Sequence, residues 1–189
     1  MLILHDKKII FVHIPKTGGG TIHKVFGQDF KGPENHYDGM TEVLCKEYFM
    51  FTFVRNPFER FVSSYLYWKD SRKLLSGISF LDYAKDLESI FAERCIEEEV
   101  VHTWDMSYLN GHKDKWQYMD FIGRFESFEN DLRLVMHLAG YDYKGDIPKE
   151  HQGSFSRNGY PYQSYYCDES RYLVEKRFSK DLLQFMYKF

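Results

Sequence analysis

The sequence predicts a single α/β domain over residues 1–189, with a central parallel sheet flanked by helices. Three stretches of the chain predict this class. An apolar run, a sharp polar stop and a helical pattern follow one another in residues 9–26, 49–71 and 118–138. Near-continuous apolar runs are typical of strands that a parallel sheet buries on both faces. Because such strands end at the same edge of the sheet, we expect the ligand at that edge.

The first stretch contains a glycine-rich turn. Residues 1–8 are a short lead-in, residues 9–14 are the predicted strand, and the turn that follows leads into a helix ending near Phe26. Glycine backbones can adopt positive φ and approach a ligand closely. The turn also carries N–H groups, a lysine ammonium and threonine hydroxyls, which together suit an anion such as phosphate. The candidate ligands are Lys16, Thr17, Gly18, Gly19, Gly20 and Thr21.

The same turn could in principle be a Walker A loop or a turn that binds no ligand. It is not a Walker A loop, because Lys16 precedes all three glycines. A glycine-rich turn before a helix, with no ligand, is the structural alternative.

The second stretch predicts a strand over residues 49–54 and a helix from Pro57 to about residue 71. Asn56 suits the N-cap, Pro57 suits the first turn, and Glu59 is placed to close a capping box. The core face of this helix is expected to hold Phe58, Phe61, Val62 and Tyr65, which leaves Arg60, Ser63 and Ser64 off that face.

Arg55 at the tip of the second strand and Ser63 on the helix therefore predict a second anion site. For Arg60, a buried salt bridge and a role in the phosphate site are equally consistent with its position. Arg124 ends the third apolar stretch, where it could reach the bound ligand or an anionic substrate, or pair with Glu126.

The rest of the chain predicts helices and loops between and after these strands. Residues 28–39 and 141–166 are expected to be loops because of their Gly, Pro, Ser and Asn content. Further helices are expected over residues 41–47, 79–95 (capped by Ser79), 100–109, 126–138 and from Asp168 to the end, and a third strand over residues 118–123.

Composition excludes several classes of protein. The chain has 25 basic and 28 acidic residues and a net charge of −3, so no global field favours nucleic acid. No apolar run is long enough for a transmembrane helix and no signal peptide is evident, which favours a cytoplasmic protein or one from which an anchor was trimmed. The three cysteines are odd in number and widely spaced, as expected for reduced thiols rather than a disulfide framework or a zinc site.

The two strand–turn–helix motifs together resemble a known family. The run Phe-Val-His-Ile-Pro-Lys-Thr-Gly-Gly from Phe11, with Phe-Val-Arg-Asn-Pro-Phe-x-Arg-Phe-x-Ser-x-Tyr from Phe53, resembles the sulfotransferases that use 3′-phosphoadenylyl sulfate (PAPS). The similarity is greatest to the carbohydrate branch, which includes the heparan 2-O-sulfotransferases and short bacterial members. Residues 119–126 and the aromatic C-terminal end are similar to the bacterial members. The resemblance implies a P-loop-like fold akin to that of nucleotide kinases.

The resemblance also implies a reaction and a set of roles. The sulfuryl group of PAPS would move in line to a hydroxyl, with Lys16 and the N–H groups of residues 17–21 meeting the departing 5′-phosphate. Arg55 and Ser63 would bind the 3′-phosphate, and Arg157 is the nearest candidate for a further 3′-phosphate contact. No metal is implied, since sulfuryl transfer brings one negative charge fewer than phosphoryl transfer and the sequence has no ligand cluster.

A general base is needed to take the proton of the acceptor hydroxyl, and histidine is the usual choice near pH 7. His36, in the loop after the first helix, is the candidate, with His102, His151 and Glu34 in reserve. His13 is expected to be structural or orienting, and His23 to pack on a helix or lie at the surface.

The resemblance to the carbohydrate branch implies a glycan or glycolipid acceptor, and the aromatic content of 19% would suit a sugar site. A small metabolite and a tyrosine are the other acceptors that remain open. Two alternatives remain. A non-catalytic protein that binds nucleotide or sulfated glycan would keep both phosphate sites and need no base. A phosphoryl transferase of related fold would need Mg²⁺ ligands and a lysine directly after the last glycine of the turn, and the sequence shows neither.

Overall fold

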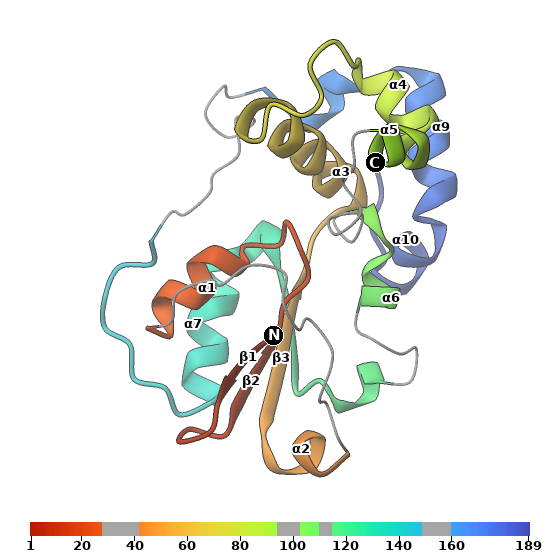
Figure 1. Cartoon of the computed structure of the whole chain (residues 1–189). Helices are drawn as coiled ribbons and strands as arrows, with labels where there is room; N and C mark the ends of the chain where they lie inside the picture. Colours follow the sequence, from red (N-terminus) through yellow and green to blue (C-terminus); the bar gives the residue numbers. More distant parts are fainter. Residues whose placement is uncertain (28–41, 94–102, 110–114, 149–159) are drawn as a thin grey trace. The chain divides into compact units, whose positions relative to one another are not determined.

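The computed structural model describes residues 1–27, 42–93, 103–109, 115–148 and 160–189. The chain divides into two compact units (Figure 1). Each unit has its own hydrophobic core. The first unit comprises residues 1–55 and 106–151, and the second comprises residues 56–105 and 152–189.

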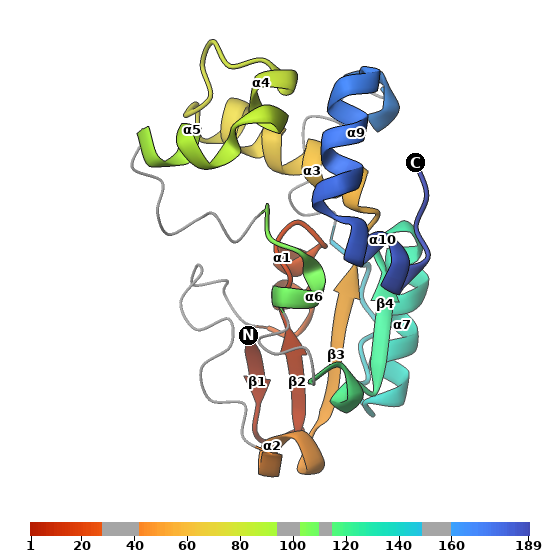
Figure 2. The ribbon, with the colours of Figure 1, turned by 90° about the vertical axis from the view of Figure 1, so that its right-hand side faces the viewer.

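The first unit is built on a four-stranded sheet in the order β1-β2-β3-β4 (Figure 2). As predicted, β2, β3 and β4 are parallel. The prediction of a wholly parallel sheet is wrong at the edge, because β1 runs antiparallel to β2 with Leu2 opposite Phe11. Residues 1–8 are therefore a strand and a tight turn rather than a lead-in. The strands are Leu2–Leu4 (β1), Ile9–Val12 (β2), Phe49–Val54 (β3) and Phe121–Arg124 (β4).

Helices α1 (Gly19–Val25) and α7 (Phe128–Leu138) pack against one face of this sheet (Figure 1). Side chains alternate between the two faces along each strand. The hydrophobic core between this face and the two helices includes Phe11, Phe51, Phe53, Ile22, Leu132 and Val135. On the opposite face, Ile10, Val12 and Met50 form a smaller cluster with Cys45 of α2 (Glu42–Glu47).

The third parallel strand starts later than predicted. Residues Lys115–Tyr118 form a 3₁₀ turn (η3) instead of beginning the strand. The next residues join the sheet through Asp120, whose carboxylate accepts the Met50 N–H at 2.7 Å and whose own N–H donates to the Met50 carbonyl at 2.8 Å. A second 3₁₀ turn, η4 (Phe125–Ser127), links β4 to α7. The same unit includes the short helix α6 (Met106–Leu109).

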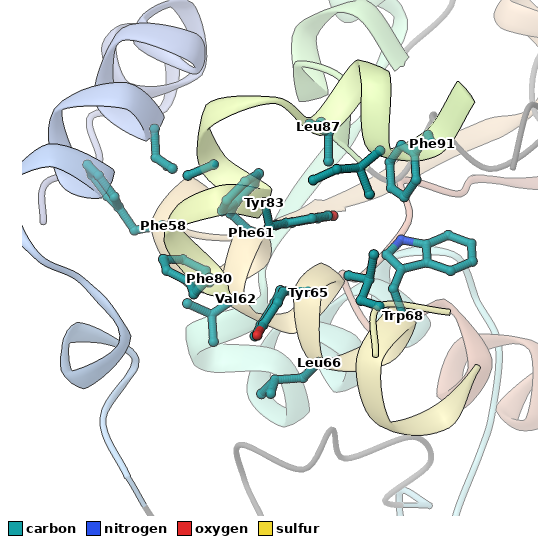
Figure 3. Close-up of a cluster of buried hydrophobic side chains, with 14 of the residues drawn as sticks. Phe58, Phe61, Val62, Tyr65, Leu66, Trp68, Phe80, Tyr83, Leu87 and Phe91 are labelled. Atoms are coloured by element: carbon teal, nitrogen blue, oxygen red, sulfur yellow. The ribbon is translucent and has the colours of Figure 1, made fainter. Parts of the chain in front are cut away.

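The second unit is helical, and its core is mainly aromatic (Figure 3). Phe61 packs against Tyr83 and Phe178, and Trp68 against Phe91. The elements are α3 (Pro57–Leu66), the π-helical turn η1 (Tyr67–Ser71), α4 (Phe80–Lys85), α5 (Leu87–Glu93), the 3₁₀ turn η5 (Tyr162–Tyr165), α9 (Asp168–Arg177) and α10 (Ser179–Phe185).

Two predicted helices of this unit are divided in the structure. The helix expected over residues 79–95 starts with the predicted Ser79 cap and then breaks at Asp86, whose side chain accepts the Ser89 N–H and so begins α5. The last helix breaks at Phe178. Its N-cap is Cys167, not Asp168, with Ser170 completing the cap.

In the described part of the chain, every helix falls short of the length and apolar character that crossing a membrane requires. The two described cysteines are both free thiols, Cys45 buried and Cys167 exposed.

Candidate functional site

The glycine-rich turn joins β2 to α1 at the carboxyl edge of the parallel strands, as predicted. Its backbone turns twice through the left-handed region, at Lys16 (φ 68°) and at Gly18 (φ 94°). Gly18 adopts this conformation at no steric cost, whereas a lysine does so only when its surroundings impose it. The strained residue is therefore the one that carries the cationic side chain.

The glycines also allow close packing. A Cβ at Gly18 would overlap the Phe128 ring, and a Cβ at Gly19 would overlap the imidazole of His13. His13 is buried between this turn and two other rings, those of Phe11 and His23. This packing agrees with the structural role expected for His13.

The two threonine hydroxyls bond to the backbone in this structure. Thr17 donates to the Ile14 carbonyl at 2.6 Å, and Thr21 donates to the Pro148 carbonyl at 3.1 Å. Both residues are buried. Their hydroxyls therefore help to fix the shape of the turn.

Lys16 and Arg55 meet at this edge of the sheet. Arg55 lies just after β3, and its Nη1 donates to the Lys16 carbonyl at 3.1 Å. Burial, together with the nearby Arg55 charge, lowers the pKa of Lys16 from 10.5 to about 7. Two basic residues at the same edge of the sheet are suited to a ligand that brings several negative charges.

The second motif forms the predicted strand and helix, and part of its predicted cap is confirmed. Asn56 accepts the Phe58 N–H at 3.0 Å and Pro57 occupies the first turn of α3. The expectation that Arg60, Ser63 and Ser64 lie off the buried face is wrong, because all three residues are buried.

Two of these buried polar residues have structural partners within the second unit. Arg60 donates to the Trp104 carbonyl at 2.9 Å, and Ser64 Oγ lies 3.0 Å from the Tyr83 hydroxyl. Arg60 is thus held by a buried hydrogen bond, which favours a structural role for it. Ser63 belongs to the second unit and Arg55 to the first.

Several predicted site residues lie outside the described residues. These are the proposed base His36, its reserves Glu34, His102 and His151, and the candidate 3′-phosphate ligand Arg157. Among the described histidines, His23 is buried on α1, and its burial, with the N-terminal amino group nearby, lowers its pKa to about 4.

The sequence interpretation missed two aromatic residues beside the turn. The ring of Phe125 lies 3.9 Å from the Arg55 guanidinium carbon, and Phe128 fills the space beside Gly18. Phe125 is the first residue after β4, and Phe128 is the first residue of α7. Their place just after the third predicted strand, at the edge where the ligand is expected, was the sequence signal that could have identified them. Arg124, the last residue of β4, donates its backbone N–H to the Asp131 carboxylate at 2.6 Å.

Elsewhere in the first unit, an open pocket of about 410 Å³ lies at the C-terminal end of α7, lined in part by Arg133, His137 and Tyr141. No residue of the glycine-rich turn lines it.

The described residues contain no cluster of His, Cys, Asp and Glu able to hold a metal ion.

Comparison with known families agrees with this geometry. The Sulfotransferase family matches over residues 1–189, a range that includes both motifs and both units. Searches among curated proteins and among solved structures found no match. A match to the whole chain, with a cationic turn at the carboxyl edge of the sheet, shows that this chain belongs to the sulfotransferase family, whose chemistry is sulfuryl transfer.

Proposed function

We propose that the chain acts as one sulfotransferase domain that moves the sulfuryl group of PAPS to a hydroxyl of a carbohydrate acceptor. The observation that carries this proposal is the meeting of Lys16 and Arg55, from the ends of two adjacent parallel strands, beside a turn of glycines. PAPS carries anionic groups on both its 5′ and 3′ positions, and two cations from different strands suit such a ligand.

The reaction is an in-line displacement at sulfur. The acceptor oxygen forms a bond to sulfur while the bond from sulfur to the 5′-phosphate oxygen breaks, and adenosine 3′,5′-bisphosphate leaves. Negative charge grows on the departing phosphate, where the Lys16 ammonium and the N–H groups of residues 17–21 would stabilise it. The acceptor proton passes to a general base, for which we propose His36.

The 3′-phosphate would bind Arg55 and Ser63, with Arg157 as a further contact. The support for Arg55 is its position in the first unit: it is buried, its guanidinium lies over an aromatic ring, and it contacts the backbone of the turn. The assignment of Ser63 and Arg157 to the 3′-phosphate is based on the resemblance of the sequence to the family. A carbohydrate acceptor rests on the resemblance to the carbohydrate branch.

The decisive experiment combines binding with transfer. Titration calorimetry should show that adenosine 3′,5′-bisphosphate binds about 10- to 150-fold more tightly than AMP, since one charge-assisted contact is worth roughly 1.5–3 kcal/mol. Transfer of labelled sulfate from PAPS to a panel of glycans should then occur with the wild type and be lost in Lys16→Ala.

Other outcomes would identify the alternatives. Tight nucleotide binding without transfer to any acceptor would indicate a binding protein. Equal affinity for AMP and the bisphosphate would refute the assignment of the 3′-phosphate site.

A further inference from the structure

Three residues after the ends of three neighbouring strands form a continuous chain of contacts, through the Lys16 backbone and the Arg55 and Phe125 side chains. Lys16 follows β2, Arg55 follows β3 and Phe125 follows β4. Arg55 Nη1 lies 3.1 Å from the Lys16 carbonyl oxygen, and its guanidinium carbon lies 3.9 Å from the centre of the Phe125 ring. The second distance is well inside the range of about 6 Å over which a cation is attracted to an aromatic face.

A second contact joins the same segment to the turn. The Phe128 ring lies against Gly18, where a Cβ would overlap it. Phe125 and Phe128 also contact each other, with ring centres 5.8 Å apart, and Phe128 packs on Phe53 of β3 at 5.0 Å. The glycine-rich turn is therefore supported at two points, through Arg55 at Lys16 and directly at Gly18.

The supporting segment is itself fixed. The backbone N–H of Arg124 donates to the Asp131 carboxylate on α7 at 2.6 Å, which ties the end of β4 to the first turn of that helix. Phe125 lies between these two anchored points. The backbone on the N-terminal side of Phe125 is thus held by a contact outside the glycine-rich turn.

We propose that Phe125 is a positioning residue for sulfuryl transfer: it holds the Arg55 guanidinium against the Lys16 carbonyl and thereby keeps the turn in its left-handed conformation. The inference rests on the proposed function, and it assigns Arg55 a second task beside 3′-phosphate binding. A turn fixed in this way presents its N–H groups to the 5′-phosphate before the nucleotide arrives, which saves the cost of ordering them on binding.

This role makes a distinctive prediction about a ligand without a 3′-phosphate. If Arg55 served only the 3′-phosphate, weakening its support would leave AMP binding unchanged. If Arg55 also holds the turn, then Phe125→Leu, which keeps an apolar side chain and removes the aromatic face, weakens both AMP and the bisphosphate. We expect a loss of roughly 3- to 30-fold in affinity, the range of a partly desolvated cation–π contact.

The test compares four proteins by titration calorimetry: the wild type, Phe125→Leu, Phe125→Tyr and Phe121→Leu. Phe125→Tyr retains the aromatic face and should bind both nucleotides within about twofold of the wild type. Phe121 is the matched control, because it is a partly buried phenylalanine at the other end of β4. Unchanged AMP affinity in Phe125→Leu, or an equal loss in Phe121→Leu, would overturn the proposal.

A second measurement separates this proposal from the proposed function. Hydrogen exchange of the amides of residues 17–21, followed by NMR without nucleotide, should be at least threefold faster in Phe125→Leu than in the wild type and Phe121→Leu. It needs no ligand, so it reports on the turn even if the wild type fails to bind the bisphosphate. Equal exchange in all three proteins would show that Phe125 does not hold the turn.

Discussion

Binding of adenosine 3′,5′-bisphosphate should draw about one proton from solution at pH 8.5, through Lys16. Burial and the Arg55 charge lower the pKa of Lys16 to about 7. An amine with that pKa is only about 3% protonated at pH 8.5, and about 90% protonated at pH 6. Two phosphates beside it would raise its pKa well above 8.5, so that the bound form is an ammonium. Net proton uptake should therefore be near one at pH 8.5, where the phosphates of the ligand are fully ionised.

The sign of the pH dependence follows from linkage. Because the pKa of Lys16 is lower in the free protein than in the complex, the contribution of Lys16 to affinity is greatest below pH 7. It then falls as the pH rises through 7, by up to about tenfold per unit. Both phosphates of the ligand are already dianions at pH 8.5, since their second pKa values are near 6, so they contribute no protons there.

The assay is titration calorimetry at pH 8.5 in two buffers with different ionisation enthalpies. The difference between the observed binding enthalpies gives the number of protons taken up. Lys16→Arg is the control, because a guanidinium stays charged at this pH and should take up none. Uptake near zero in the wild type, or equal uptake in both proteins, would refute the argument that the empty site holds a neutral lysine.

Two further predictions concern histidines. His36→Ala should leave nucleotide affinity unchanged and reduce transfer by roughly 10²–10⁴-fold. The acidic limb of the pH–rate profile should disappear with it, and a retained limb would point to another base. Gly19→Ala should lower the free energy of unfolding by about 1–3 kcal/mol, because the new Cβ overlaps the His13 ring. In a urea-denaturation cycle, adding His13→Ala should make the double variant less destabilised than the sum of the two single changes, and strict additivity would contradict the overlap.

The sequence predicts the parallel strands well because their pattern is local. The apolar runs over residues 9–14 and 49–54 form β2 and β3, although β2 ends at Val12, two residues before the predicted end. The antiparallel strand β1 was missed because it has three residues, too few for a periodic pattern, and its place depends on pairing with β2.

The helix predicted over residues 79–95 is divided in the structure because a polar side chain interrupts it, although its apolar repeat continues. The repeat in residues 79–95 continues across Asp86, but the Asp86 carboxylate accepts a backbone N–H three residues later and starts a new helix. Apolar spacing does not record such a competition between side chain and backbone.

In the candidate site, too, the sequence identifies residues but not the tertiary contacts between them. Lys16, Gly18 and Arg55 are recognisable from residue type and from their place after a strand. The contact of Arg55 with Phe125 joins residues seventy positions apart, and it depends on the β3–β4 register, in which Val54 lies opposite Arg124. The positive φ of Lys16 also has no sequence signal, because lysine has no preference for that conformation.

That positive φ means that selection for stability and selection for activity act in opposite directions at this position. Lys8, in the turn between β1 and β2, shares the conformation with a φ of 53°. A thermostabilising screen would therefore favour glycine or asparagine at both positions, since these residues tolerate left-handed backbone best. At position 8 the exchange removes an exposed side chain from a surface turn. At position 16 it removes the ammonium proposed to meet the leaving group, so a library ranked by melting temperature alone would enrich inactive proteins.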